Sequence, residues 1–184
     1  VVTKPFSFEG KPRMNNAMSG IARLQDQVDT MIVIPNDKLL QICDKRTTIP
    51  DALKKADEVL QQGVQGITDM IYNPGLINVD FADIQTVMRD KGIAHIGMGV
   101  ADEELEAIKT AMESPLLETT VAGATDVIVN FAGAVGMLEA QQAVEYLKDE
   151  AGAEVNVIFG TVNADFGDQI SATIIASGIK NTDG

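Results

Sequence analysis

The segment from Pro50 to Tyr72 most limits the fold of this chain, because it predicts a helix longer than any other in the sequence. Thr48 stands where an N-cap is expected, and the proline at the start of the segment suits the first helical turn. Gly63 and Gly66 each cost roughly 1 kcal/mol relative to alanine inside a helix, so tertiary packing must hold this stretch. Asn73-Pro74-Gly75 ends the helix. The apolar residues expected on its buried face are Leu53, Ala56, Leu60, Val64, Ile67 and Ile71.

Short runs rich in β-branched residues alternate with helical patterns on both sides of this long helix. Before it, apolar residues from Met14 to Val28 recur at helical spacing, Thr30 to Ile34 predicts a strand, and Pro35-Asn36-Asp37 can start another helix. Alternation that closes with two neighbouring strands predicts an α/β fold with a mixed sheet. The remaining expected helices are 83–89, 103–112 and 137–148, and the remaining expected strands are 94–97, 126–131, 155–160 and 170–176.

Charge and composition exclude several classes of partner. The formal net charge is −13 at pH 7, so nucleic acid and anionic membrane surfaces would be repelled. The apolar runs are too short for membrane insertion. Cys43 is the only cysteine, which excludes an intrachain disulfide and fits the cytosol. Val1-Val2-Thr3 has the pattern of a strand that is already under way at the first residue, so we expect that a preceding part of a larger protein exists.

Two carboxylates stand three residues apart at the expected start of a helix, in the segment Asn78 to Asp83. Asp80 can be the N-cap and Asp83 the acidic residue at the third helical position, an arrangement that the spacing alone favours. Alternatively, Asp80 and Asp83 orient or deprotonate a water molecule, with Asn78 supplying an amide beside it. The chain has no G-x-x-x-x-G-K-S/T loop, so another chain would have to supply any nucleotide attacked there.

Four other polar residues are candidates for ligand contacts. Glu9 and Arg13 follow a strand, where open α/β sheets bind ligands, although an exposed ion pair explains them about equally well. Asn36 and Asp57 carry groups that can read a purine edge. Without other support, Asn36 is a turn residue and Asp57 a solvated helix residue.

Two further kinds of chemistry find no support in the sequence. Gly97-Met98-Gly99 lacks the third glycine of a dinucleotide fingerprint, and acidic residues crowd the following helix start, so we expect no phosphate there. His95 has no second histidine or cysteine near it in the sequence, and two carboxylates alone make an incomplete magnesium site. No metal site is predicted.

Three segments, in this order along the chain, together resemble the FtsZ family of tubulin-like cell-division GTPases. They are Val1 to Gly10, Ile34 to Lys38 and Gly63 to Asp83, and the similarity is most specific from Pro74 to Asp83. Ser114 to Glu118 and Phe159-Gly160-Thr161 extend the resemblance over essentially the whole chain.

The resemblance implies a domain organisation. Residues 1–49 would be the end of a Rossmann-like GTP-binding domain, and residues 50–92 the central helix, a catalytic loop and a short helix. Residues 93–180 would form a smaller C-terminal α/β domain with a mixed four-stranded sheet, and residues 181–184 the start of a tail.

The resemblance also implies a function, that of a GTP-hydrolysing subunit of cytoplasmic filaments at the division septum. Subunits would associate head to tail, and the loop Asn73 to Asp83 would enter the nucleotide site of the next subunit and promote hydrolysis there. GTP or GDP would be the ligand, and Mg²⁺ can accompany it. In the family the residues that match Glu9 and Arg13 contact ribose and phosphate, and those that match Asn36 and Asp57 contact the guanine side.

Three departures from the family follow from the same comparison of motifs. The glycine-rich phosphate loop G-G-G-T-G-T-G would precede Val1, so these residues alone are not expected to hold GTP tightly or hydrolyse it. The segment from Gly99 to Pro115 is shorter than usual in the family, and it lacks the glycine and the arginine generally found before the helix in this segment. The tail that recruits other division-ring proteins is also missing. An alternative is that the isolated chain is a non-catalytic interaction module that caps or joins filaments of full-length subunits.

Overall fold

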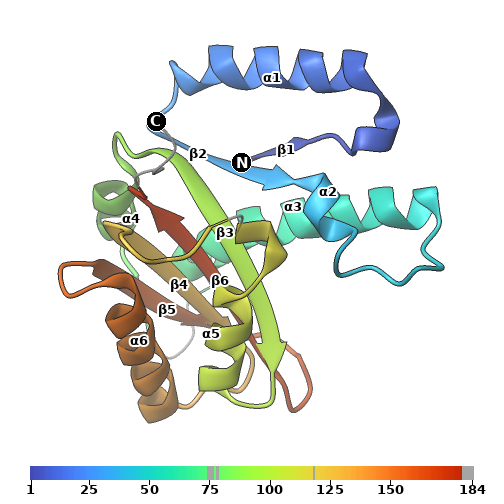
Figure 1. Cartoon of the computed structure of the whole chain (residues 1–184). Helices are drawn as coiled ribbons and strands as arrows, with labels where there is room; N and C mark the ends of the chain where they lie inside the picture. Colours follow the sequence, from blue (N-terminus) through green and yellow to red (C-terminus); the bar gives the residue numbers. More distant parts are fainter. Residues whose placement is uncertain (74–76, 78, 118, 180–184) are drawn as a thin grey trace.

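The computed structural model describes residues 1–73, 77, 79–117 and 119–179, and six strands of these residues form one mixed sheet (Figure 1). The strand order is β1-β2-β3-β6-β4-β5. Pairing is parallel along β1, β2 and β3 and between β4 and β5, whereas β6 is antiparallel to both β3 and β4. The strands are β1 (Val2–Lys4), β2 (Thr30–Pro35), β3 (Gly92–Ala101), β4 (Asp126–Ala132), β5 (Asn156–Val162) and β6 (Ile170–Ser177).

Strand β3 makes the sheet continuous, because its two ends have different partners. Gly92 to Ala94 pair with Thr30 to Ile32 of β2, and His95 to Ala101 pair with β6. The predicted four-stranded mixed sheet is therefore present as β3, β6, β4 and β5, and β1 and β2 extend it to six strands.

Helices cover both faces of this sheet, as the alternation of strand residues requires. Val127, Val129 and Phe131 of β4 face the core formed with α5 and α6, whereas Ile128 faces the core formed with α3 and α4. The helical elements are η1 (Ser7–Glu9), α1 (Lys11–Gln25), α2 (Asn36–Leu39), α3 (Ile49–Tyr72), α4 (Phe81–Met88), α5 (Glu104–Met112), η2 (Pro115–Leu117) and α6 (Met137–Ala151).

Helix α3 confirms the long helix that the sequence predicts, including its cap: the backbone N of Asp51 donates to Oγ1 of Thr48 at 3.3 Å. The predicted buried face was wrong in part, because Leu53 and Val64 are 40% and 44% exposed. Two glycines are among the residues buried on this helix, and at Gly63 a Cβ atom would meet the side chain of Ile96 at 3.3 Å. The buried residues of α3 are Ala52, Ala56, Val59, Gly63, Gly66 and Met70.

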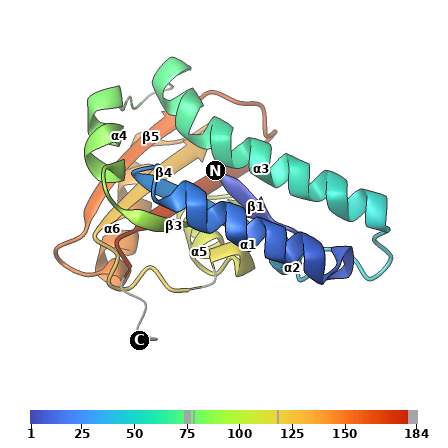
Figure 2. The ribbon, with the colours of Figure 1, turned by 90° about the horizontal axis from the view of Figure 1, so that it is seen from above.

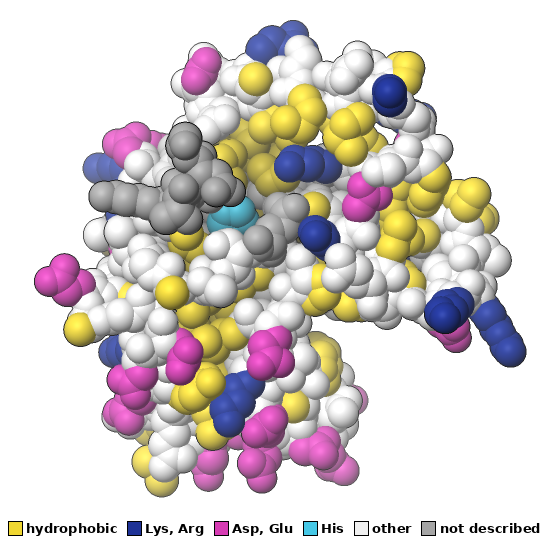
Figure 3. Space-filling model, in the orientation of Figure 1, with side chains coloured by type: hydrophobic (Ala, Val, Ile, Leu, Met, Phe, Trp, Pro, Cys, Tyr) yellow, Lys and Arg dark blue, Asp and Glu magenta, His cyan; other side chains and the backbone are white. Residues whose placement is uncertain are grey.

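Helix α1 lies beyond β1 and β2 and has no buried residue (Figures 1 and 2). The helical spacing of apolar residues predicted this helix, yet Met18 and Leu24 are 46% and 42% exposed. Hydrophobic side chains are visible in the hollow between α1 and the sheet (Figure 3). The apolar face of α1 is therefore uncovered in this chain.

Gly97 and Gly99 of β3 allow α5 to pack closely on this strand. A Cβ atom on Gly99 would lie 2.5 Å from both the carbonyl oxygen of Ala107 and the backbone N of Ala111, and one on Gly97 would also overlap the backbone of α5. The first turn of α5 is acidic, and Oε1 of Glu104 accepts a hydrogen bond from the backbone N of Gly136 at 2.8 Å.

An ion pair joins the starts of β3 and β4 across the end of β6. Nζ of Lys91 lies 2.7 Å from Oδ2 of Asp126, which also accepts a hydrogen bond from Thr125. Burial alone would raise the pKa of Asp126, but hydrogen bonds from Lys91, Thr125 and Asn156 and the charge of Lys91 hold that pKa below its usual value. This pair therefore stabilises the fold above the ordinary pKa of the carboxyl group, and its contribution is lost as the pH falls through the folded-state pKa.

Among the described residues, the structure contains no helix that combines the length and the hydrophobicity needed to cross a bilayer.

Replacing Gly99 by alanine should lower the free energy of unfolding by about 1–3 kcal/mol, because the added methyl group overlaps the backbone of α5. Gly20→Ala is the matched control, since a Cβ atom there meets nothing within 4 Å and alanine favours the helix. Urea denaturation measures both. An equally small effect of the two substitutions would contradict the close packing of α5 on β3.

Candidate functional site

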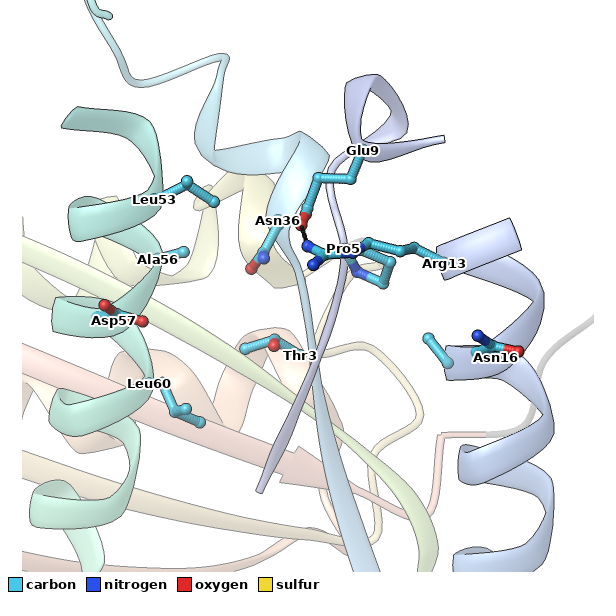
Figure 4. A pocket seen from close by; sticks show the side chains of 11 residues that line it. Thr3, Pro5, Glu9, Arg13, Asn16, Asn36, Leu53, Ala56, Asp57 and Leu60 are labelled. Carbon is cyan, nitrogen blue, oxygen red and sulfur yellow. Dashed lines mark hydrogen bonds and ion pairs between the residues drawn. The ribbon is translucent and has the colours of Figure 1, made fainter. Parts of the chain in front are cut away.

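A cavity of about 510 Å³ opens where β1 and β2 end, between α1 and α3 (Figure 4). This is the carboxyl edge of parallel strands, the place where open α/β sheets bind ligands. The cavity brings together all four residues that the sequence proposes for nucleotide contacts: Glu9, Arg13, Asn36 and Asp57. They come from η1, α1, α2 and α3, so the fold unites four elements at one site.

Glu9 and Arg13 form one wall of the cavity and are already paired. Nη1 of Arg13 lies 2.7 Å from Oε1 of Glu9, and the other carboxylate oxygen accepts a hydrogen bond from the backbone N of Phe6 at 2.8 Å. The Glu9 side chain is only 13% exposed, whereas that of Arg13 is 71% exposed. The turn thus fixes the carboxylate and leaves the guanidinium reachable by an anion. Gly10, at φ 102°, reverses the chain between the two residues.

Asn36 at the start of α2 and Asp57 on α3 supply further polar groups to the cavity (Figure 4). Asn36 follows directly after β2, is 6% exposed, and its Oδ1 atom is buried without a hydrogen-bond partner. Such an atom is costly unless a ligand or water satisfies it. Asp57 is exposed on α3 one turn after Leu53. The arrangement offers a buried amide and a carboxylate to a flat heterocycle with hydrogen-bond donors and acceptors.

Two polar residues of the lining, Thr3 and Asn16, were missed by sequence reasoning. Thr3 lies in β1, two residues before Pro5, and Asn16 lies on α1 three residues after Arg13. Helix positions three apart share a face, so the spacing from Arg13 could have identified Asn16. No comparable signal marks Thr3.

Asp80 and Asp83 stand at the start of α4, and neither lines this cavity. Asp80 is the N-cap, and its Oδ1 accepts a hydrogen bond from the backbone N of Ala82 at 3.4 Å. Asp83 is the third helical residue, so the predicted capping arrangement is present for Asp80. Both side chains are exposed. Asn78 lies outside the described residues.

The segment before α4 is tied to the far strand of the sheet. The backbone N of Ile77 donates to Oγ1 of Thr161 at 2.9 Å, and the backbone N of Thr161 donates to the carbonyl oxygen of Ile77 at 3.0 Å. Val79 is buried, and a Cβ atom on Gly160 would meet its side chain at 3.0 Å. The aspartates are therefore held on a packed element.

The cavity and the two aspartates lie at opposite ends of the same scaffold. Helix α3 has 24 residues and spans about 36 Å, with Asp57 in its first half and α4 beyond its end at Tyr72. Strand β2 shows the same separation. Asn36 follows the end of β2, whereas Oγ1 of Thr30, at the start of β2, donates a hydrogen bond to the carbonyl oxygen of Met88 in α4. Asp80 and Asp83 therefore cannot reach a ligand in the cavity of their own chain.

The described residues contain no group of three or more histidine, cysteine, aspartate or glutamate side chains placed to hold a metal ion.

Comparison with protein families divides the chain into two matching parts. Residues 1–44 match the GTPase domain of the tubulin/FtsZ family, and residues 92–180 match the C-terminal domain of the FtsZ family. Similar solved structures cover nearly the whole chain. An empty FtsZ dimer from M. jannaschii is 37% identical, with a TM-score of 0.91 over 97% of this chain and 54% of that one.

The chain belongs to the FtsZ family. A mutant FtsZ from M. jannaschii is likewise 37% identical, with a TM-score of 0.92 over 97% of this chain and 55% of that one. CetZ1 from Haloferax volcanii, a GDP-bound monomer, has a TM-score of 0.78 at 15% identity over 99% of this chain and 56% of that one, which shows a shared fold. The chain thus spans about half the length of these proteins, from the end of the GTPase domain through the FtsZ C-terminal domain.

Removing the cap at Asp80 should destabilise α4. Asp80→Ala is expected to lower the free energy of unfolding by about 0.5–2 kcal/mol, whereas Asp80→Asn should change it far less, because asparagine caps nearly as well. Asp83→Ala should lower the free energy of unfolding less than Asp80→Ala does, since the Asp83 charge stabilises α4 through the helix dipole and not as a cap. Urea denaturation compares the three variants. Equal stability of Asp80→Ala and the unaltered chain would show that Asp80 is no cap.

Proposed function

We propose that this chain is part of a GTP-binding, GTP-hydrolysing subunit of a cell-division filament, in which the loop Asn73 to Asp83 completes the GTPase site of the adjacent subunit. One observation carries the proposal: the cavity that gathers the nucleotide-binding candidates and the aspartates that could act on a nucleotide lie at opposite ends of α3. Such a chain has two halves of a site, and only a second subunit can unite them.

The cavity takes the nucleoside end of GTP or GDP in this account. Glu9 accepts hydrogen bonds from ribose hydroxyls, and Arg13 turns from Glu9 toward a phosphate. Asn36 and Asp57 contact the guanine side, where the unpartnered Oδ1 of Asn36 gains a donor. The cavity volume of about 510 Å³ lies within the range of small-molecule sites.

The aspartates act on the nucleotide of the neighbouring subunit. Asp83 and Asp80 accept hydrogen bonds from a water molecule, hold it against the terminal phosphate and can take up its proton, and Asn78 adds an amide beside them. Because Asp80 also caps α4, the helix holds both carboxylates in place while they face the neighbour. Mg²⁺ bound with GTP would neutralise phosphate charge.

Head-to-tail association follows from this division of the site, and the M. jannaschii FtsZ dimer shows that a relative self-associates. The uncovered apolar face of α1 and the edge strand β1 support a second partner, the N-terminal half of the GTPase domain that carries the phosphate loop. In the cell, we place the filament in the cytoplasm at the division septum, where a tail would recruit other division-ring proteins.

Asp83→Ala should separate binding from hydrolysis in the complete subunit, meaning residues 1–184 joined behind the N-terminal half of an FtsZ GTPase domain. GTP affinity should stay unchanged, because Asp83 lies outside the cavity, whereas polymer-dependent hydrolysis should fall about 100-fold or more. Equilibrium binding and phosphate release measure the two effects. Lost GTP affinity with normal hydrolysis per bound nucleotide would contradict the role of Asp83.

An alternative concerns the chain of residues 1–184 taken alone, whose sequence has no glycine-rich phosphate loop. By itself it would be a non-catalytic module that docks its aspartate end onto full-length subunits and caps or joins their filaments. Phosphate release by residues 1–184 alone would overturn this alternative, and release that appears only with an added N-terminal half would support complementation.

A further inference from the structure

Asp37 links two walls of the cavity although it does not line the cavity itself. Its Oδ1 accepts a hydrogen bond from the backbone N of Ser7 at 2.8 Å, and its Oδ2 accepts one from Oγ of Ser7. The two residues are 30 positions apart in the sequence. Asp37 therefore holds Ser7 with both carboxylate oxygens, which fixes distance and orientation together.

Each end of this link is next to a ligand candidate. Ser7 begins η1, the turn that ends with Glu9, and Asp37 directly follows Asn36. The link thus connects the wall assigned to ribose and phosphate with the wall assigned to the base.

The other contacts of the turn are local to its own part of the chain. The backbone N of Phe6 donates to Oε2 of Glu9 at 2.8 Å, and the rings of Phe6 and Phe8 stack with their centroids 4.8 Å apart. These contacts fix the shape of η1 but do not join it to α2, which the link from Asp37 to Ser7 does. Because buried Phe6 and the pairing of β1 with β2 hold the backbone before Ser7, loss of the link should leave the fold intact and let η1 move as a unit relative to α2.

We propose that Asp37 is a positioning residue of the nucleotide site, which sets the spacing between the Glu9 wall and the Asn36 wall through its two hydrogen bonds to Ser7. The proposal rests on the proposed nucleotide-binding function of the cavity. A nucleotide bridges both walls, so it needs both walls at the right spacing. The same spacing has no bearing on the aspartate loop at the other end of α3.

The test compares Asp37→Ala with Asp37→Asn in the complete subunit. Asp37→Ala loses both bonds, so KM for GTP and Kd for GDP should rise about tenfold while kcat at saturating GTP stays unchanged. Asp37→Asn should restore both constants, because its amide oxygen can accept from the backbone N of Ser7 and its amide nitrogen can donate to Oγ of Ser7. A lower kcat with unchanged KM, or failure of the asparagine variant to rescue, would overturn the positioning role.

Two further variants keep the outcome interpretable. Ser7→Ala removes one of the two hydrogen bonds, so it should raise Kd for GDP less than Asp37→Ala does. It also tests the link if Asp37→Ala fails to fold. In that case, an unchanged Kd for GDP in Ser7→Ala would overturn the proposal. Asn36→Ala reports on the cavity itself. If Asn36→Ala weakens GDP binding and Asp37→Ala does not, the positioning role is wrong and the binding site stands. If Asn36→Ala also has no effect, the proposed function of the cavity is wrong.

Discussion

The packing of α3 against the sheet fixes where the cavity and the aspartates lie relative to each other. Gly63 faces β3, where a Cβ atom would meet the side chain of Ile96 at 3.3 Å, and Gly66 faces Asn130 of β4 and Thr173 of β6 at ordinary contact distance. Nδ2 of Asn130 in β4 donates to the carbonyl oxygen of Gly66 at 2.9 Å, which joins helix and sheet by a buried polar contact. Because the helix is held along its length in this way, the distance between the cavity at one end and the aspartates at the other end is fixed.

Much of the fold could be predicted, because local signals and global packing agree in most elements. Thr48 as the cap of α3, the alternation of strands and helices and the mixed sheet all follow from local pattern. The buried face of α3 could not be predicted correctly, because glycine and alanine carry a weak hydrophobic signal and the larger Leu53 and Val64 stand beside them. Extension of the sheet to β1 and β2 depends on the full length of β3, which the apolar core of that strand did not reveal.

Part of the candidate site could also be predicted from the sequence, and part of it could not. The carboxylates at the start of α4 follow from spacing, and the structure confirms Asp80 as the cap. Single polar residues such as Glu9 and Asn36 can each be explained as an exposed ion pair or a turn residue. In the sequence, only the resemblance to the family indicated that they belong to one binding site. Their convergence on one cavity is a tertiary property, and so is the link from Asp37 to Ser7 across 30 residues. The cap at Asp80 is compatible with the chemistry that we propose for this residue, because capping holds the exposed carboxylate in a fixed position.

If the cavity and the aspartates act together only across two subunits, as we propose, then mixing two defective complete subunits should restore hydrolysis. Asp83→Ala leaves the cavity intact but disables the loop, whereas a variant with both Arg13→Ala and Asn36→Ala disables the cavity and leaves the loop intact. Each variant alone should hydrolyse GTP slowly. Co-assembled, they form interfaces in which an intact cavity meets an intact loop, so phosphate release should rise above that of either variant. A mixture that hydrolyses GTP only at the average of the two separate rates would contradict the account.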